Sequence, residues 1–378
     1  MRSHPLCAPL GDTMHEGPHG RLVVRSIGTA SPRDAARAAL GLGVDVPTMV
    51  RAFYQAPAII TEGLPLHTAH EVAEVLRALG CEVEAVAADD PPPGPVPLRD
   101  VAVQVRDERR FEAIAAAAAG FVGCGEEEAR RLLLATPPVL VGQVSPASIE
   151  ALGERVGEGA DVLVSDPATT RYDLLLGDCP APARARLVAA LRAAGHSPGV
   201  DGPWMLRDLS REEADEIWEA HSRVPGLRLA DQGFYRYEVL LDDGSPGEAA
   251  DAVLTGVGIP PELVPRLFDE LPLVIADGCT AQEAAALLEQ LAGAGLVAHA
   301  ELSTFLQLAV RVTGWTTPAR VRAALRSAGA TEDPGEPPFA LGPFPALTAR
   351  LMRDLLLRAG ADAELEEPSE LVEAGGPR

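Results

Sequence analysis

The chain has 378 residues, of which 47% are hydrophobic and 4% aromatic, and its 55 acidic and 32 basic residues give a net charge of −23. A protein that binds nucleic-acid phosphates needs clustered basic side chains, which this acidic balance argues against. The same balance disfavours an anionic membrane surface. We therefore expect neither nucleic acid nor a membrane as a partner.

The cysteines and the hydrophobic pattern indicate a cytoplasmic protein. An odd, unclustered set of thiols without a C-x-x-C pair is typical of a reducing compartment. No apolar run reaches transmembrane length, and the N-terminal sequence lacks the apolar core of a signal peptide. The five cysteines are Cys7, Cys81, Cys124, Cys179 and Cys279.

In chain order, residues 1–20 are polar and aperiodic and predict a flexible tail. The first repeating segment then alternates strand-like and helical patterns. Pro follows Ser31 at the start of the first helix, as helix starts favour. The expected elements are a strand at 22–27, a first helix that begins at residues 31–34, a second helix near 47–54, a strand at 58–60, a helix at about 68–79 and a strand at 81–86. The order is βααβαβ.

The same pattern returns about every 65 residues, which indicates one supersecondary unit copied along the chain. Each repeat ends on a small turn with a closing glycine, at Gly80, Gly159, Gly226, Gly295 and Gly360, with separations of 79, 67, 69 and 65 residues. The longer first separation contains a proline-rich segment at 89–97, which predicts a stiff linker. A unit this small buries only ~60% of its unfolded surface and gains stability from its neighbours.

We therefore predict an α+β fold, a tandem array of five small βααβαβ-type units. Repeats three and five carry Gly/Pro-rich segments at 196–203 and 333–338, so we expect them to lack the second helix. The expected boundaries are 21–88 for repeat one, 98–167 for two, 168–233 for three, 234–303 for four and 304–367 for five, with a tail at 368–378.

Repeats one, two and four share a finer signature. A proline follows the second helix, in Ala56-Pro57, Thr136-Pro137 and Leu271-Pro272. A glycine comes five or six residues later, and the closing glycine follows seventeen residues after that; the earlier glycines are Gly63, Gly142 and Gly278. This pattern resembles the C-terminal domain of the bacterial ribosomal stalk protein. Repeat four, with Tyr237–Pro246, is also similar to the related ClpS adaptor fold.

The resemblance implies a fold that binds peptides and proteins. The stalk domain recruits translation GTPases through basic side chains on its first two helices, whereas this chain has no Lys and offers only Arg37 between residues 36 and 50. The ClpS adaptor grips a peptide's α-amino group with an Asn-Asp pair and a Thr. Asp242 and Ser245 match the Asp and the Thr, and Leu241 stands in place of the Asn.

The acidic turn of repeat four is a candidate binding site. Asp242 and Asp243 precede Gly244-Ser245-Pro246, and two carboxylates on one turn can accept hydrogen bonds from a cationic group. The alternative is an ordinary turn in which Ser245 caps the next helix.

Aromatic residues gather near the entry to repeat four. Phe234 and Tyr235 stand beside Arg236, and Trp204 and Trp218 lie in repeat three. Aromatic and Arg side chains dominate the energetics of interfaces, which makes these five residues candidate partner-binding anchors. The alternative is that the rings fill gaps left by the missing helix or hold neighbouring repeats together.

No catalytic motif is present. His67 and His70 have the spacing of two metal ligands on one helix face, but no third ligand is visible, and a surface or capping role is the alternative. Cys179 lacks the base and positive surroundings of a nucleophile. We therefore expect no catalytic residue, no metal site and no cofactor.

Together these patterns predict a non-enzymatic scaffold or adaptor in the cytoplasm that binds a peptide or protein with a basic or amino-terminal feature. The alternative is an accessory protein that presents a peptide substrate to a modifying enzyme or protease.

Overall fold

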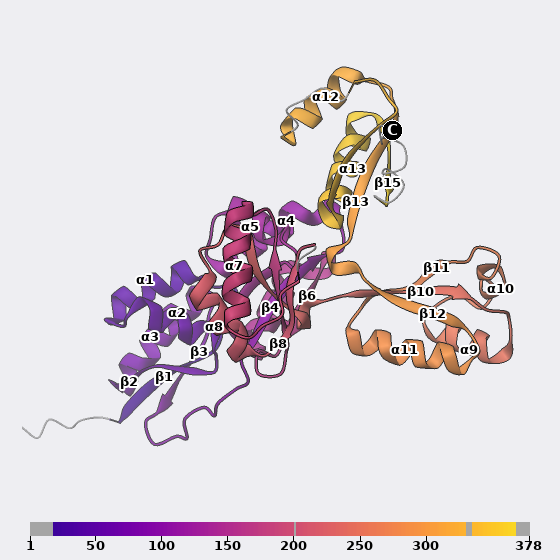
Figure 1. Cartoon of the computed structure of the whole chain (residues 1–378). Coiled ribbons are helices and arrows are strands. Elements are labelled where there is room, and N and C mark those ends of the chain that lie inside the picture. The colour runs from indigo at the N-terminus through magenta and orange to yellow at the C-terminus, as the bar shows by residue number, and fades with distance from the viewer. Residues whose placement is uncertain (1–17, 200–201, 330–334, 368–378) are drawn as a thin grey trace, which may run out of the picture. The chain divides into compact units, whose positions relative to one another are not determined.

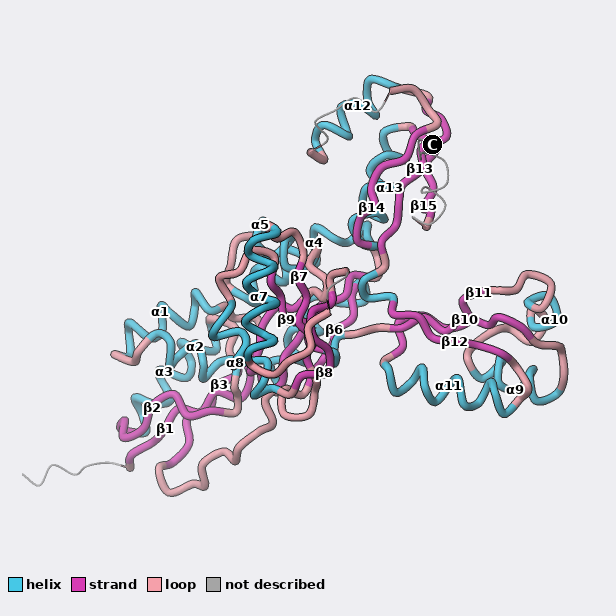
Figure 2. Tube along the Cα trace, viewed as in Figure 1, coloured by secondary structure: helices cyan, strands magenta, loops and turns pink. Residues whose placement is uncertain are grey.

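The computed structural model describes residues 18–199, 202–329 and 335–367. Within them the chain is mixed α+β, with five small three-stranded sheets (Figures 1 and 2). The tails expected at 1–20 and 368–378 lie outside the described residues, apart from residues 18–20. Among the described residues, no helix is long and apolar enough to cross a bilayer.

Repeats one, two and four have two helices between their first and second strands. Repeat one contains β1 (His19–Ser26), α1 (Pro32–Leu42), α2 (Val46–Tyr54), β2 (Ala58–Pro65), α3 (Leu66–Ala78) and β3 (Glu82–Ala87). Repeat two contains β4 (Arg99–Val105), η1 (Glu108–Arg110), α4 (Phe111–Val122), α5 (Glu126–Leu133), β5 (Val139–Val144), α6 (Pro146–Val156), η2 (Gly157–Gly159) and β6 (Ala160–Ser165). Repeat four contains β10 (Tyr237–Asp243), α9 (Glu248–Gly256), α10 (Val264–Leu267), β11 (Leu273–Cys279), α11 (Ala281–Gly293) and β12 (Val297–Leu302).

In repeats three and five, a single helix precedes the second strand within the described residues. Repeat three contains β7 (Tyr172–Leu176), α7 (Ala181–Ala193), β8 (Trp204–Leu209), α8 (Arg211–His221) and β9 (Leu227–Asp231), and η3 (Gln232–Phe234) follows it. Repeat five begins after η4 (Ser303–Phe305) and contains β13 (Gln307–Trp315), α12 (Pro318–Ser327), β14 (Phe339–Pro345), α13 (Ala346–Ala359) and β15 (Ala361–Glu366).

Every sheet has the same strand order. The first strand of the repeat is central, with the second strand on one side and the third on the other, as in β2-β1-β3. The registered pairs are antiparallel. In repeat four, Val239 and Leu241 of the central strand face a core shared with Leu254 of α9 and Leu291 of α11. Because side chains alternate along a strand, each sheet therefore has a helix-covered face and a second face.

The helix boundaries follow from capping residues. Ser31 begins α1 and forms a capping box with Asp34, and Thr280 and Glu283 do the same for α11. In each box the hydroxyl accepts the N3 amide, while the acidic side chain accepts the cap amide, so two otherwise unpaired donors are satisfied. Short polar side chains thus fix where these helices start.

The turn before the third helix needs a left-handed residue. Gly63 and Gly278 have φ of 77° and 69°. In repeat two the sequence signature pointed to Gly142, but the left-handed residue is Gln143, with φ 61°. Gln143 lies three residues before its helix, as Gly63 and Gly278 do, so the backbone bend keeps its place although the glycine has moved. Such a conformation is uncommon outside glycine.

The chain divides into two compact units. Unit one comprises residues 1–98, 119–124 and 143–155, and unit two comprises the remainder. Within unit one, Ser148 of α6 donates to the carbonyls of Phe53 and Tyr54, at 3.2 and 2.9 Å. The Tyr54 hydroxyl donates to the Phe121 carbonyl at 2.6 Å. The two bonds from Ser148 satisfy carbonyls at the end of α2, and the bond from Tyr54 satisfies a carbonyl at the end of α4.

Within unit two, residues of the short linker between β9 and β10 cover the second faces of two sheets. Phe234 packs on Ala102 and Leu163 of the repeat-two sheet. Its neighbour Tyr235 packs on Leu175 of the repeat-three sheet, in a cluster that also takes in Ala230, Trp204, Tyr237, Leu302 and Phe305. The two aromatic residues of one short linker therefore contribute to two different apolar clusters.

Candidate functional site

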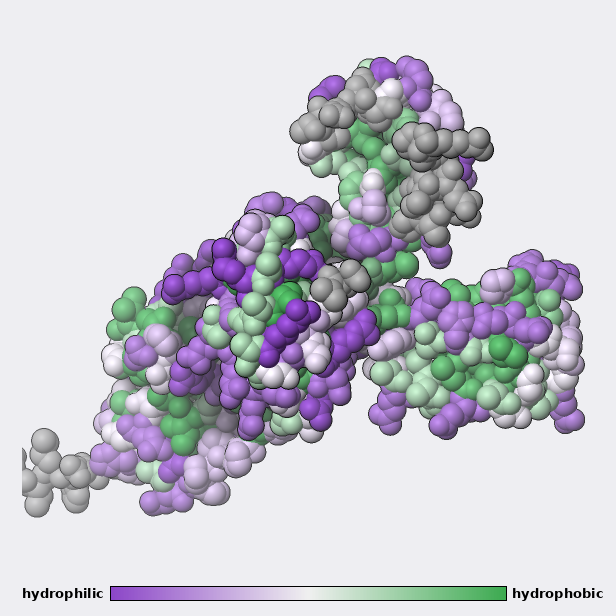
Figure 3. Space-filling view, viewed as in Figure 1, coloured by the Kyte–Doolittle hydropathy of each residue, from purple (hydrophilic) through white to green (hydrophobic). Residues whose placement is uncertain are grey.

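The second face of the repeat-four sheet carries charged side chains. Antiparallel pairing places Leu240 opposite His299 and Glu238 opposite Glu301, and Val274 of β11 also pairs with Leu240. Asp242 lies on the same face, two residues after Leu240. We call this surface the acidic face, defined by Glu238, Leu240, Asp242, Val274, His299 and Glu301. Figure 3 shows hydrophilic residues gathered over β10.

His299 joins two carboxylates on the acidic face. Its Nδ1 lies 2.7 Å from Asp242 Oδ2, and its Nε2 lies 3.0 Å from Glu301 Oε1. The hydrogen bonds to Asp242 and then to Glu301 raise the pKa of His299 above its usual value. The imidazole thus lies between two carboxylates that favour its protonated form, on the side of the sheet where Val274 is 44% exposed.

Glu238 adds to the negative charge of this surface. Partial burial, together with the nearby charges of Asp277 and Glu301, raises the pKa of the Glu238 carboxyl. A cation placed here would relieve that repulsion, because opposite charges favour the ionised form. The carboxylates of the acidic face can therefore accept hydrogen bonds from ammonium or guanidinium groups, and Leu240 and Val274 add apolar surface beside them.

A side chain at the end of β10 holds the start of the loop that follows. Asp243 Oδ1 accepts a hydrogen bond from the Gly244 amide at 2.8 Å. The alternative in which Ser245 caps the following helix is wrong, since α9 begins after Gly247 and has no side-chain cap. Of the predicted residues, Asp242 lies on the acidic face, Asp243 ends β10, where it pairs with Val297, and Ser245 lies in the loop.

The predicted aromatic anchors are mostly internal. Phe234 and Tyr235 are 1% and 4% exposed, and Trp204 stacks edge-on against Tyr235 and Phe305. The Tyr235 hydroxyl donates to Asp173 at 2.9 Å. This burial corrects the expectation that Phe234 and Tyr235 meet a partner and favours the alternative, that the rings hold repeats together.

Trp218 differs from the other predicted aromatic residues. It is 41% exposed on α8. With Thr136, Val139, Leu175 and Arg228 it lines a shallow cleft of about 270 Å³. Trp218 therefore keeps a surface that a partner can reach.

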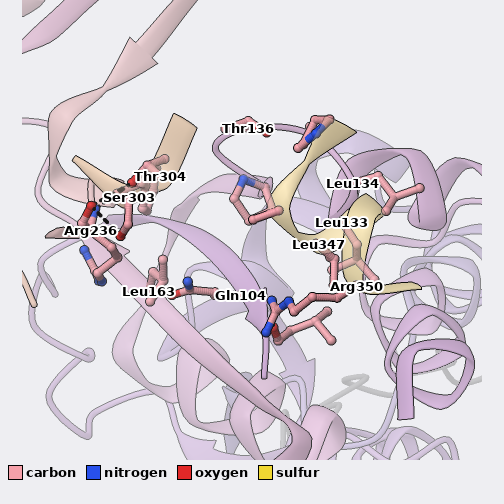
Figure 4. A pocket seen from close by; sticks show the side chains of 16 residues that line it. Gln104, Leu133, Leu134, Thr136, Leu163, Arg236, Ser303, Thr304, Leu347 and Arg350 are labelled. Carbon is pink, nitrogen blue, oxygen red and sulfur yellow. Dashed lines mark hydrogen bonds between the residues drawn. The ribbon is translucent and has the colours of Figure 1, made fainter. Parts of the chain in front are cut away.

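Arg236 lines a second, smaller cleft of about 90 Å³ (Figure 4). Its backbone amide donates to Thr304 Oγ1 at 2.6 Å, and its carbonyl accepts from Ser303 Oγ at 3.0 Å. These bonds join η4 to the start of repeat four. The side chain is 8% exposed and donates through Nη1 to the Tyr235 and Gly233 carbonyls, at 2.7 and 3.2 Å.

Burial lowers the pKa of Arg236, while the charges of Glu283 and Asp161 oppose that effect. The cleft also contains Gln104, from the second face of the repeat-two sheet, and Arg350, from α13. Sequence reasoning identified Arg236 but not these two residues. They lie far from Arg236 in the chain, and no local motif marks either one.

His299 was also missed from the sequence. Its pairing with Asp242 depends on the register of β10 and β12, although an alternating His-Ala-Glu segment in a strand was a usable signal. His67 and His70 lie on α3, where the His67 ring contacts the Thr68 hydroxyl at 3.2 Å. Among the residues that the structure describes, no group of three or more His, Cys, Asp or Glu side chains is arranged so that it could hold a metal ion.

Comparison of the chain with protein-family models, curated proteins and solved structures gave no match.

Proposed function

We propose that the chain is a non-enzymatic scaffold or adaptor that binds a peptide or protein with a basic or amino-terminal feature on the acidic face of repeat four. The observation that carries the proposal is the exposed set of Asp242, His299 and Glu301 beside the apolar Val274. Carboxylates on a sheet face pair with cationic groups, and adjoining apolar side chains contribute affinity.

The architecture supports a binding role over a role as spacer. Linker aromatics cover the second faces of the sheets in repeats two and three. In repeat four the equivalent face keeps charged side chains, and the side chain of Glu301 is 63% exposed. A net charge of −23 would also steer a basic partner toward this surface, because long-range attraction raises association rates.

The proposal includes the finer fold assignment. The order βααβαβ in repeats one, two and four, with the first strand central, supports the likeness to the ribosomal stalk C-terminal domain and the ClpS adaptor. Both of those folds bind peptides or proteins. Cys81, Cys124, Cys179 and Cys279 are free thiols, which supports a place in the reducing cytoplasm.

Selection from a peptide library on the full chain tests this function. Peptides with free amino termini are selected on the wild type and counter-selected on the double variant Asp242→Asn, Glu301→Gln. We expect enrichment of Arg, Lys or a free terminal amine beside apolar residues, with binding that weakens as salt rises. Enrichment of acidic peptides, or equal retention on the double variant, would contradict the proposal.

A further inference from the structure

The small cleft beside Arg236 has an unusual composition for so acidic a chain. Ten of its sixteen lining residues are apolar, among them Leu163 and Leu347, and none is Asp or Glu. Arg236 and Arg350 supply its cationic groups. Figure 4 shows both arginines and Gln104 around the same opening. The cleft is thus a positively charged, partly apolar site in a protein of net charge −23.

Two buried polar atoms of the cleft lack a hydrogen bond among the described residues. The Nε of Arg350 and the Oε1 of Gln104 are buried without a hydrogen bond. Arg350 donates only through Nη2, to the Val105 carbonyl at 3.2 Å, and the Arg236 side chain donates only through Nη1. Among the described residues, neither arginine forms an ion pair. Buried polar groups are nearly always hydrogen-bonded, so two unpaired buried atoms in one cleft, on Arg350 and Gln104, indicate a missing ligand.

The positive charge of the two arginines indicates that the ligand is an anion. A buried cation without a counter-ion costs free energy that an anion with good geometry offsets. Guanidinium groups bind carboxylates and phosphates in particular, because their planar donors match paired oxygens. The Gln104 amide can rotate to present its NH₂ to the same anion, and the Thr136 hydroxyl also lines the cleft.

The cleft volume limits the ligand to a small molecule, and the apolar lining favours a carboxylate over a phosphate. The cleft volume of about 90 Å³ is smaller than the ~150 Å³ cavity that holds benzene. Its apolar walls suit a short aliphatic chain and would leave phosphate oxygens unpaired. We propose that this cleft binds the carboxylate of a short aliphatic acid between Arg236 and Arg350. The shared chemistry is that of propionate, either as a free acid or as the end of a glutamate side chain.

The test is calorimetric titration of the full chain with propionate, propionamide, inorganic phosphate and an acetylated, amidated Ala-Glu-Ala peptide. We expect saturable binding of propionate and none of the neutral amide, which has nearly the same shape. Tighter binding of the peptide would identify a protein side chain as the source, and tighter binding of propionate a free acid. Binding of phosphate without propionate would overturn the assignment.

Variants of α13 provide the matched comparison. Arg350→Met should weaken propionate binding at least tenfold, and Arg350→Lys should weaken it less, since a positive charge remains. Arg358→Met, on the same helix but outside the cleft, should bind as the wild type does. Arg236→Met should also lose binding, provided its thermal unfolding stays cooperative. Unchanged affinity in a folded Arg350→Met variant would overturn the proposal.

Discussion

Replacing Phe234 with alanine tests whether the linker before repeat four is part of the core of unit two. The ring is 1% exposed and packs on Ala102 and Leu163. Each buried CH₂-sized group contributes about 0.8 kcal/mol, so loss of a phenyl ring has an upper bound of about 5 kcal/mol. Deletions of buried Phe rings cost about 3–5 kcal/mol, because the cavity only partly collapses. We expect a loss within that range.

The fluorescence of Trp204 allows unfolding to be followed close to Phe234. Its ring lies 5.1 Å from Phe305 and 6.4 Å from Tyr235, so its fluorescence reports the cluster beside Phe234. Urea unfolding is followed in a background in which Trp218 and Trp315 are changed to Phe. Leu357→Ala is the control, since this side chain is 47% exposed and its loss should change stability by less than about 0.5 kcal/mol.

A stability change below about 1 kcal/mol in Phe234→Ala would refute the reasoning. Such a result would mean that the ring does not fill the second face of the repeat-two sheet. A decrease in the slope of the unfolding curve, without a shift of its midpoint, would also count against the reasoning, because that pattern reports a change in exposed surface rather than in packing.

Three further substitutions follow from single contacts. Asp242→Asn should lower the pKa of His299 toward about 6.5 in an NMR titration, whereas Asp243→Asn should not. Because the pKa of His299 is raised in the folded state, the stability that this residue contributes is complete below its unfolded pKa and is lost as pH rises through its folded pKa. Equal profiles of stability against pH for the wild type and Asp242→Asn would contradict this. Ser148→Ala should cost about 1–3 kcal/mol in chemical unfolding, because two buried carbonyls lose a donor, and a neutral effect would argue against that contact. Thr280→Ala should cost about 1 kcal/mol by loss of its capping box, with unchanged stability as the contrary outcome.

The sequence allowed the repeated α+β organisation to be predicted because its signals are local. Ser31 with Asp34, and the prolines that follow the second helices, mark element ends within a few residues. The short repeats were recognised for the same reason, from Gly/Pro-rich segments that exclude a helix. In repeat two the glycine of the signature, Gly142, lies one residue before the left-handed residue, Gln143, because glycine is the usual but not the required residue in that conformation.

The candidate sites could be predicted only in part because they depend on long-range contacts. Asp242 was identified from its turn, but its partner His299 becomes visible only when β10 and β12 are paired in register. The sequence suggests Phe234 and Tyr235 as partner-binding anchors because aromatic residues concentrate there in a chain that has few of them, and aromatic side chains dominate interface energetics. Their burial arises from two sheets that are distant in the sequence.

The most direct test of the proposed function is the affinity of a library-selected basic peptide for the wild type and for two variants. We predict that Asp242→Asn combined with Glu301→Gln weakens binding at least tenfold, while Asp243→Asn, at the end of β10 and outside the acidic face, leaves it unchanged. Equal affinity of all three proteins would contradict a receptor role for the acidic face.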